Sequence, residues 1–237
     1  MTPIFLPGWC LGRGPLQAVA EATNGHILDL PGYGTSDLPP NFDLAVSALA
    51  AQLPPRTRLV GWSLGAQLAL AIASRFPEKI DKLVLIAGTA SFLARENWPH
   101  GLPASVLDGF KTGIAADFTK TLPRFVGSFN RGDARSKAVT QLLLDCANAA
   151  PQPPLATLLA GLDWLRDTDL CAELPTINAP TLLIHGAADP LMPLAAAKAI
   201  AATIPNTQLV VMADCAHAPF SSQPDIFLSH LQSFLHA

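Results

Sequence analysis

Short apolar runs alternate with stretches of helical spacing along most of the 237 residues, and this alternation limits the possible folds most strongly. The apolar runs indicate buried strands, because they are apolar on both faces and bounded by glycine, proline or polar residues. They cover residues 3–6, 26–30, 57–62, 81–88, 180–186 and 207–212. Helical spacing covers residues 14–22, 42–52, 65–75, 194–203 and 224–235. The pattern predicts an α/β fold with a mostly parallel sheet and helices on both faces.

The alternation stops between residues 91 and 170. Strand signals vanish there, and Phe, Leu and Trp recur at helical spacing. We interpret residues 91–170 as a helical insertion that lies as a lid over one end of the sheet, and residues 1–90 with 171–237 as the core. Half of the residues are hydrophobic, so a chain of this length can bury one substantial core.

Charge and cysteine content exclude several functional classes. The net charge is −3, whereas a nucleic-acid-binding domain is usually basic. The cysteines are scattered and lack metal-ligand spacing, so we expect no metal site. Reduced thiols in the cytosol are the simplest interpretation of these cysteines. The cysteines are Cys10, Cys146, Cys171 and Cys215. The N-terminus does not resemble a signal peptide, and no apolar run reaches about 18 residues. We therefore expect a cytoplasmic protein with neither nucleic-acid nor membrane partners.

The stretch GWSLG, from Gly61 to Gly65, places Ser63 where a predicted strand becomes a predicted helix. This matches the pattern G-x-S-x-G, in which a catalytic serine occupies a strained turn at the end of a central strand. Glycines flank that serine because side chains there would collide with the neighbouring helix and strand. Serine and glycine also form ordinary tight loops, so a catalytic role requires a base and an acid elsewhere in the chain.

His217 is the best candidate for the base, because it falls in the loop ADCAHAPF after the last predicted strand. Asp189 follows another strand, in AADPLMP, although such an aspartate is often only a turn residue and Asp214 is a rival acid. The order Ser63, Asp189, His217, each after a different strand, is typical of α/β-hydrolase triads. The carboxyl ends of parallel strands share one edge of the sheet, so the three side chains can meet there. The other histidines have structural interpretations; they are His26, His100, His185, His230 and His236.

An oxyanion hole would complete this chemistry, because acyl transfer builds negative charge on the carbonyl oxygen. One donor would be the backbone N–H of Leu64, directly after the serine. The other would come from the loop LPGWCLG after the first strand, where the N–H of Trp9 is best placed. By itself, PGW is equally consistent with a turn that carries a packed tryptophan.

Several segments together resemble the α/β-hydrolase superfamily over nearly the whole chain: LPGWCLG, LDLPGYGTSD, LVGWSLGAQLA, HGAADPLMP and CAHAPF. GWSLG, SFLARENWP and AHAPFSSQPDIF closely resemble the pimeloyl-[acyl-carrier protein] methyl ester esterases of biotin synthesis. The resemblance implies a serine carboxylesterase without cofactor, in which Ser63 is the nucleophile, Asp189 the acid and His217 the base.

The same resemblance implies substrate contacts and shows two departures. It implies that Trp9, Ser63, Leu64, His217 and a lid segment contact the substrate; the segment comprises Phe125, Val126, Gly127, Ser128 and Phe129. Pro7 replaces the histidine that usually precedes the oxyanion Gly-Trp pair. The chain also starts at the strand before that loop, so we expect the two usual N-terminal strands to be missing and one sheet edge to be less protected.

A basic segment lies inside the insertion. Residues 111–137 contain six basic residues against Asp117 and Asp133, in a chain that is acidic overall. One interpretation is a docking face for an acidic acyl carrier protein, formed by Lys120, Arg124, Arg131 and Arg135. The alternative is a solvated helix face. The interleaved apolar residues would line a tunnel for the acyl chain, or would simply pack in the core of the insertion.

Three other functions share parts of this pattern. A broad-specificity esterase for short acyl esters has every catalytic feature in common, and only substrate profiling separates it. A lyase on the same scaffold would keep the triad without an acyl-enzyme burst. A binding protein without catalysis would show no ester turnover. We expect the protein to act as a monomer.

Overall fold

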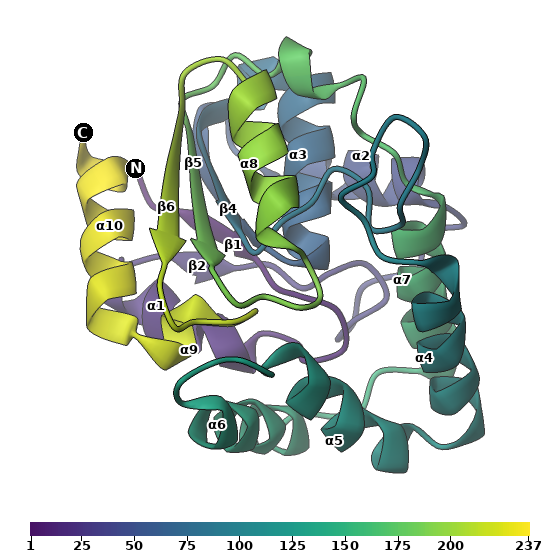
Figure 1. Cartoon of the computed structure of the whole chain (residues 1–237). Helices are drawn as coiled ribbons and strands as arrows, with labels where there is room; N and C mark the ends of the chain where they lie inside the picture. Colours follow the sequence, from purple (N-terminus) through teal and green to yellow (C-terminus); the bar gives the residue numbers. More distant parts are fainter.

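The six strands form one sheet in the computed structural model, which describes residues 1–237 (Figure 1). Every neighbouring pair is parallel, in the order β2-β1-β3-β4-β5-β6. The strands are β1 (Ile4–Leu6), β2 (His26–Ile27), β3 (Thr57–Trp62), β4 (Ile80–Ile86), β5 (Thr181–Gly186) and β6 (Thr207–Met212). The short β2 forms one edge of the sheet and β6 forms the other. This is the fold of the α/β hydrolases.

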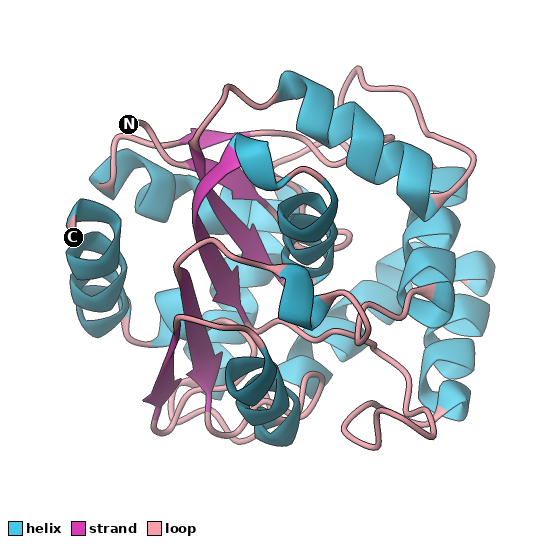
Figure 2. Ribbon diagram, turned by 90° about the horizontal axis from the view of Figure 1, so that it is seen from above, coloured by secondary structure: helices cyan, strands magenta, loops and turns pink.

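Helices cover both faces of the sheet, as Figure 2 shows from above. One face is covered by α2 (Phe42–Gln52), α3 (Leu64–Arg75) and α8 (Leu194–Thr203). The other is covered by α1 (Gln17–Ala22), which continues the 3₁₀ turn Gly14–Leu16, and by α10 (Pro224–His236). The remaining short elements are the 3₁₀ turns Pro77–Lys79 and Leu174–Thr176 and the helix α9 (Pro219–Ser222). Sheets with only parallel strands need this two-sided cover, since both faces are apolar.

Four helices occupy the insertion between β4 and β5: α4 (Ala104–Ala116), α5 (Phe118–Phe129), α6 (Ser136–Asn148) and α7 (Leu155–Asp167). Figure 1 shows them beyond the arrowheads of the strands, so the insertion lies at the carboxyl ends of the sheet. Helix α5 begins after Asp117, whose side chain accepts a hydrogen bond from the N–H of Lys120 at 3.0 Å. Such an N-cap satisfies one of the free N–H groups at the start of a helix.

One hydrophobic cluster of 71 buried residues joins the sheet, its covering helices and the insertion. Val126 of α5 and Leu158 of α7 are fully buried, as are Phe5 and Val84 of the sheet. The insertion therefore shares its core with the rest of the molecule, and its position depends on packing against the strand ends.

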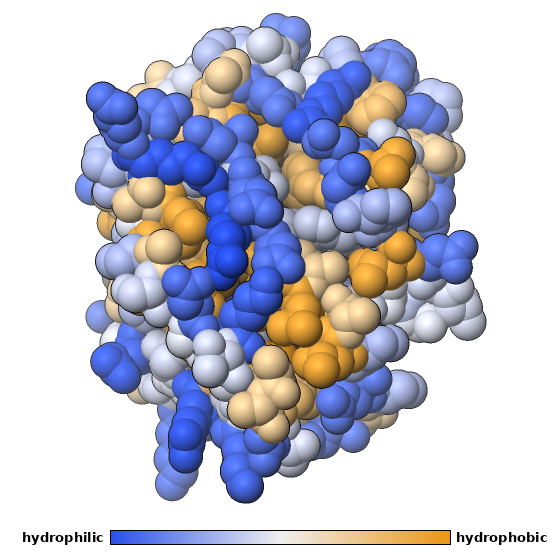
Figure 3. All heavy atoms as spheres, turned by 90° about the vertical axis from the view of Figure 1, so that its right-hand side faces the viewer, coloured by the Kyte–Doolittle hydropathy of each residue, from blue (hydrophilic) through white to orange (hydrophobic).

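The side of the molecule where α4 and α7 lie carries both hydrophilic and apolar surface. Figure 3 shows apolar side chains gathered over the lower half of this side. Val106, Leu142 and Leu155 are among the large apolar side chains of the insertion that remain exposed. No helix of the structure combines the length and the apolar character that crossing a membrane requires.

Candidate active site

Ser63 lies on a sharp turn between β3 and α3. Its backbone has φ of 56°, a left-handed conformation that non-glycine residues rarely adopt. The turn is tight enough that a Cβ on Gly65 would lie 2.3 Å from the carbonyl oxygen of Leu6. A side chain at that position is therefore excluded, which explains the second glycine of the motif. Such strain concentrates at functional sites, and here it presents the serine hydroxyl at the end of the sheet.

The structure brings Ser63, Asp189 and His217 together, although 126 or more positions separate the serine from the other two. The hydroxyl of Ser63 donates to Nε2 of His217 at 2.9 Å. Nδ1 of His217 donates to Oδ2 of Asp189 at 2.8 Å. All three residues are buried, and His217 is only 1% exposed. This is the geometry in which an imidazole can take a proton from the serine while a carboxylate fixes its tautomer.

Surrounding groups hold both partners of the serine in place. Oδ1 of Asp189 accepts the backbone N–H groups of Leu191 and Met192, each at 2.9 Å. Nε2 of His185 lies 2.6 Å from the carbonyl oxygen of Met192, and burial lowers the pKa of His185, which favours its neutral form. The carbonyl oxygen of His217 accepts the indole N–H of Trp62 at 2.9 Å. The acid and the base thus each occupy a loop fixed by additional hydrogen bonds.

The loop after β1 brings Trp9 to the same cavity that Ser63 lines. The backbone N–H of Trp9 has no hydrogen-bond acceptor within the protein, and Leu64 is the first residue of α3, where an N–H has no partner inside its helix. The Trp9 indole packs edge-on against Phe125 at 5.2 Å between ring centroids, and donates to the carbonyl oxygen of Leu158 in α7 at 2.9 Å. Two free backbone donors beside a serine hydroxyl are what an oxyanion hole requires.

Tyr33 supports the same loop from the turn that follows β2. Its hydroxyl accepts the backbone N–H of Cys10, directly after Trp9, at 2.9 Å. Cys10 itself has φ of 64°, so the loop is strained at this point. Pro7 contributes no side-chain donor or acceptor to the loop. Burial raises the pKa of Tyr33 far above its usual value, so the hydroxyl stays protonated and neutral at physiological pH.

Tyr33→Phe is therefore expected to lower kcat for an ester substrate. The substitution leaves the buried N–H of Cys10 without an acceptor, in a loop that is already strained. The loop should therefore shift, and the N–H of Trp9 should no longer point at the position of the oxyanion. We expect kcat to fall roughly three- to tenfold with little change in KM, because the oxyanion forms only in the transition state. Steady-state kinetics with a small ester measures kcat and KM separately. A kcat equal to that of the wild type would show that the tyrosine hydroxyl has no part in positioning the loop.

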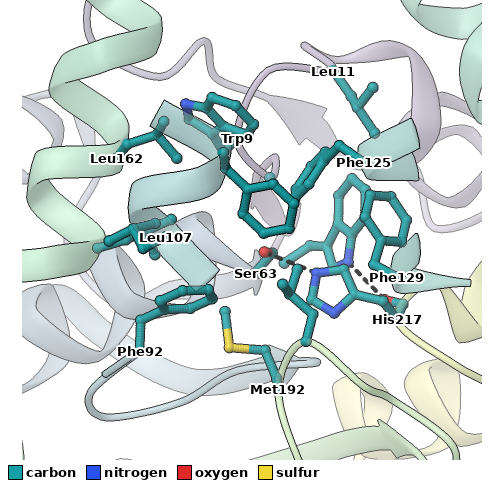
Figure 4. A pocket seen from close by; sticks show the side chains of 15 residues that line it. Trp9, Leu11, Ser63, Phe92, Leu107, Phe125, Phe129, Leu162, Met192 and His217 are labelled. Atoms are coloured by element: carbon teal, nitrogen blue, oxygen red, sulfur yellow. Dashed lines mark hydrogen bonds between the residues drawn. The ribbon is translucent and has the colours of Figure 1, made fainter. Parts of the chain in front are cut away.

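Apolar side chains enclose the space in front of Ser63, as Figure 4 shows. Fifteen residues line this cavity, and 12 of them are hydrophobic. Core and insertion contribute jointly: Trp9 and Leu11 come from the loop after β1 in the core. The insertion contributes Phe92, Leu107, Phe125, Phe129 and Leu162. Such a cavity suits an apolar acyl chain that ends in a polar reacting group.

The segment from residue 125 to residue 129 is divided between different surroundings. Phe125 and Phe129 line the cavity, and the Phe129 ring lies 5.1 Å from the imidazole of His217. Val126 is fully buried away from it, and Gly127 does not line it. Ser128 lines a separate surface pocket instead. Two of the five expected contacts therefore face the cavity.

Some lining residues carry no recognisable sequence signal. Leu107 and Leu162 follow helical spacing, and apolar residues at that spacing look alike whether they face a core or a cavity. Leu191 and Met192 are different, since they lie two and three residues after Asp189 in a loop that follows a strand, and that position could have indicated them. No group of three or more His, Cys, Asp or Glu side chains in the structure could hold a metal ion.

Comparisons with known proteins agree with this geometry. Residues 4–224 match the family described as alpha/beta hydrolase fold. A pimeloyl-[acyl-carrier protein] methyl ester esterase of Nitrosomonas europaea is 37% identical over 232 residues, covering 95% of this chain and 92% of the relative. The protein of the same name from Aromatoleum aromaticum is 40% identical, covering 94% of this chain and 93% of the relative.

A solved structure supports the same fold. The esterase EaEST from Exiguobacterium antarcticum superposes with a TM-score of 0.87, covering 100% of this chain and 92% of that protein. At 22% identity, this likeness concerns the fold alone. The extended sequence identity to the named esterases is more specific. The chain belongs to the α/β-hydrolase family and, within it, to the family of the pimeloyl-[acyl-carrier protein] methyl ester esterases.

Proposed function

We propose that this protein is a serine esterase that hydrolyses the methyl ester of pimeloyl-[acyl-carrier protein] and so frees the pimeloyl carboxylate for biotin synthesis. The observation that carries the proposal is the unbroken hydrogen-bond chain from Ser63 through His217 to Asp189, facing an apolar cavity. Identity of 33–40% to relatives of that name supports the choice of substrate.

In the first half of the reaction, Oγ of Ser63 attacks the ester carbonyl carbon while Nε2 of His217 takes the hydroxyl proton. The carbonyl oxygen becomes an oxyanion, which accepts hydrogen bonds from the N–H groups of Trp9 and Leu64. The tetrahedral intermediate then collapses, and His217 passes its proton to the departing methoxide. Methanol leaves, and the pimeloyl chain remains on Ser63 as an ester. Asp189 stabilises the imidazolium throughout.

The second half repeats these steps with water. His217 takes a proton from a water molecule, whose oxygen attacks the acyl-enzyme carbonyl carbon. The same two N–H groups hold the second oxyanion. Ser63 then departs with the proton that His217 returns, and the product is a free carboxylic acid. Each step uses groups that the buried site already holds in position, so none needs a cofactor.

The position of the ester constrains the path of the acyl chain. Pimeloyl is a dicarboxylic chain joined to the carrier at one end, so the methyl ester at the other end must reach Ser63 from the surface. A second, outer pocket opens beside the cavity and shares three lining residues with it: Phe110, Phe129 and Leu191. Arg131 lines this outer pocket. We propose that the acyl chain runs from the cavity through this outer pocket toward the basic segment.

The four basic residues of the proposed docking face are all exposed. Lys120 and Arg124 lie one turn apart on α5, on the same helix face, and Arg131 and Arg135 lie in the connection between α5 and α6. Lys120 pairs with Asp117, whereas Arg124 and Arg131 form no salt bridge in the structure. Arg124 and Arg131 are therefore available to an acidic carrier.

Reversing both charges, in Arg124→Glu/Arg131→Glu, is expected to raise KM for the carrier-bound ester. Exposed ion pairs contribute only about 0.2–1 kcal/mol each, so the double reversal should raise KM roughly tenfold. Added salt should also raise the KM of the wild-type enzyme for the carrier-bound ester, because it screens the attraction between the basic residues and the acidic carrier. Steady-state kinetics at two ionic strengths measures both effects, with a small uncharged ester as the second substrate.

Lys198→Glu provides a control for this experiment. Lys198 is an exposed lysine of α8 without a salt bridge, so its reversal changes the charge without touching the proposed face. The control should leave KM for the carrier-bound ester nearly unchanged. Equal losses on both substrates in the double variant would indicate a damaged insertion. No loss on either would identify the basic residues as an ordinary solvated face.

The proposed substrate is tested by comparing turnover of pimeloyl methyl ester on its carrier with turnover of a short nitrophenyl ester. The proposal requires a clearly higher kcat/KM for the carrier-bound ester. A preference for the short ester would identify a broad-specificity esterase. Absence of an acyl-enzyme burst, despite labelling by a fluorophosphonate, would identify a lyase.

We also propose that the protein acts as a monomer in the cytoplasm. A single chain supplies the triad, both free N–H donors and all 15 residues that line the cavity, which supports a monomeric enzyme. The four cysteines are free thiols, as is usual in a reducing compartment.

A further inference from the structure

Asp133 is a buried carboxylate outside the triad, in the connection between α5 and α6. It is 7% exposed, and both of its oxygens accept hydrogen bonds. Oδ1 accepts the backbone N–H of Arg135 at 2.7 Å and the hydroxyl of Ser222 at 2.8 Å. Oδ2 accepts the backbone N–H of Ala216 at 2.9 Å. Three donors thus offset the cost of burying the carboxylate.

Two of these contacts cross from the insertion to the core: one reaches Ala216 in the loop that carries His217, and the other reaches Ser222 in α9, directly after that loop. Ala216 directly precedes His217 and is 83 positions away from Asp133 along the chain. Two further hydrogen bonds run beside it: the N–H of Ala134 donates to the carbonyl oxygen of Asp214, and the guanidinium of Arg135 donates to that of Ser222, each at 2.9 Å. Residues 133–135 of the connection therefore hydrogen-bond directly to the histidine loop and to α9.

The backbone around His217 is held from two sides. On the core side, the indole N–H of Trp62 donates to the carbonyl oxygen of His217 at 2.9 Å. On the side of the insertion, Asp133 accepts the N–H of the preceding residue, Ala216. The imidazole must stay within hydrogen-bond distance of Ser63 and Asp189 at once, and small displacements of reacting groups cost large factors in rate.

We propose that Asp133 is a positioning residue for His217: it fastens the connection between α5 and α6 to the backbone beside the base, and so keeps the imidazole aligned with Ser63. The inference rests on the proposed function, in which His217 is the base. It adds a consequence for the insertion, which then supports the catalytic histidine as well as covering the cavity. Arg131 and Arg135 of the proposed docking face lie in the same connection, two residues to either side of Asp133.

Asp133→Asn tests this role. Both oxygens of the carboxylate accept hydrogen bonds from donors. Asparagine has only one acceptor oxygen, so its NH₂ group must face a donor on the other side and one of these hydrogen bonds is lost. We expect kcat for a small uncharged ester to fall roughly tenfold while KM stays within about twofold, because the cavity itself is unchanged. The low-field proton NMR resonance of the His217 Nδ1–H in its hydrogen bond to Asp189 should broaden or disappear.

Ser222→Ala is the matched control. It removes one hydrogen bond from Oδ1 and leaves the bond between Oδ2 and Ala216 in place. We expect kcat within about threefold of the wild type and an intact low-field resonance. If Asp133→Asn retains wild-type kcat and resonance, or if Ser222→Ala loses as much as Asp133→Asn, the carboxylate only stabilises the fold and the proposal is wrong.

Should Asp133→Asn fail to fold, Asp133→Glu gives the same test, because it keeps both acceptors and displaces them by one methylene. Its kcat should fall with KM retained, and an unchanged kcat would overturn the proposal. The NMR resonance and the small ester both report on alignment without the carrier. If the wild-type enzyme hydrolyses the small ester and not the carrier-bound one, the proposed substrate fails while the role of Asp133 stays testable.

Discussion

Ser63→Ala is expected to lower kcat for ester hydrolysis by roughly five to six orders of magnitude, because triad residues act as a unit and alanine offers no nucleophile. The remaining rate should come from water attack assisted by the proposed oxyanion donors, the N–H groups of Trp9 and Leu64. The fold should persist, since the hydroxyl makes its only side-chain hydrogen bond to His217. Steady-state kinetics with a nitrophenyl ester measures the loss.

Covalent labelling gives an independent check on the serine. A fluorophosphonate should modify the wild-type protein once, at Ser63, and should leave Ser63→Ala unmodified. Ser47→Ala is a suitable control, since Ser47 lies in α2 with its hydroxyl bonded to the carbonyl oxygen of Asp43. That control should keep wild-type labelling and turnover. Substantial turnover by Ser63→Ala would mean that another nucleophile carries the reaction.

Asp189→Asn is expected to lower kcat by roughly four orders of magnitude, through loss of the correct histidine tautomer. Oδ1 of Asp189 already accepts two backbone N–H groups, so the asparagine amide oxygen is held there and its NH₂ group faces Nδ1 of His217. Nδ1 must then accept, which places the ring proton on Nε2, toward Ser63. An imidazole in that form cannot take the serine proton. Kinetics over the neutral pH range measures this loss.

Asp214→Asn is the matched comparison, because Asp214 is the rival acid in sequence. Its side chain is exposed, and only its backbone carbonyl oxygen takes part in the contacts of the histidine loop. It has φ of 58°, a conformation that asparagine tolerates well. We expect kcat within about twofold of the wild type, since exposed substitutions have small effects. A large loss here together with normal turnover of Asp189→Asn would reverse the assignment of the acid.

The strands and covering helices could be predicted closely because each is a local pattern. The expected bounds 57–62 and 207–212 agree with β3 and β6, and those of 42–52 and 194–203 agree with α2 and α8. Predicted and observed strand boundaries differ where a neighbouring side chain or a proline ends the strand early. The run 26–30 forms only the two-residue β2, since Asp29 turns to pair with Arg13 and Pro31 cannot donate to a ladder.

The candidate site was predictable in kind and less so in detail. The residue types of the triad and their order follow from motifs at strand ends, where a parallel sheet gathers its loops. Contacts between distant loops carry no such signal: Tyr33 with Cys10, and Asp133 with Ala216, each join a side chain to a backbone N–H. Any residue offers that N–H, so no residue type in the sequence marks the contact.

The contact between the Trp9 indole and α7 affects how this enzyme can be re-engineered. The indole reaches the carbonyl oxygen of Leu158 because the facing position is Gly161, where a Cβ would lie 2.5 Å from the ring. A chimera that joins this core to another protein's insertion would need an equally small residue and a free carbonyl at those two positions. Without them, the graft would displace Trp9 and its backbone N–H along with it. New substrate ranges are therefore better sought by point substitutions within the insertion than by exchanging it whole.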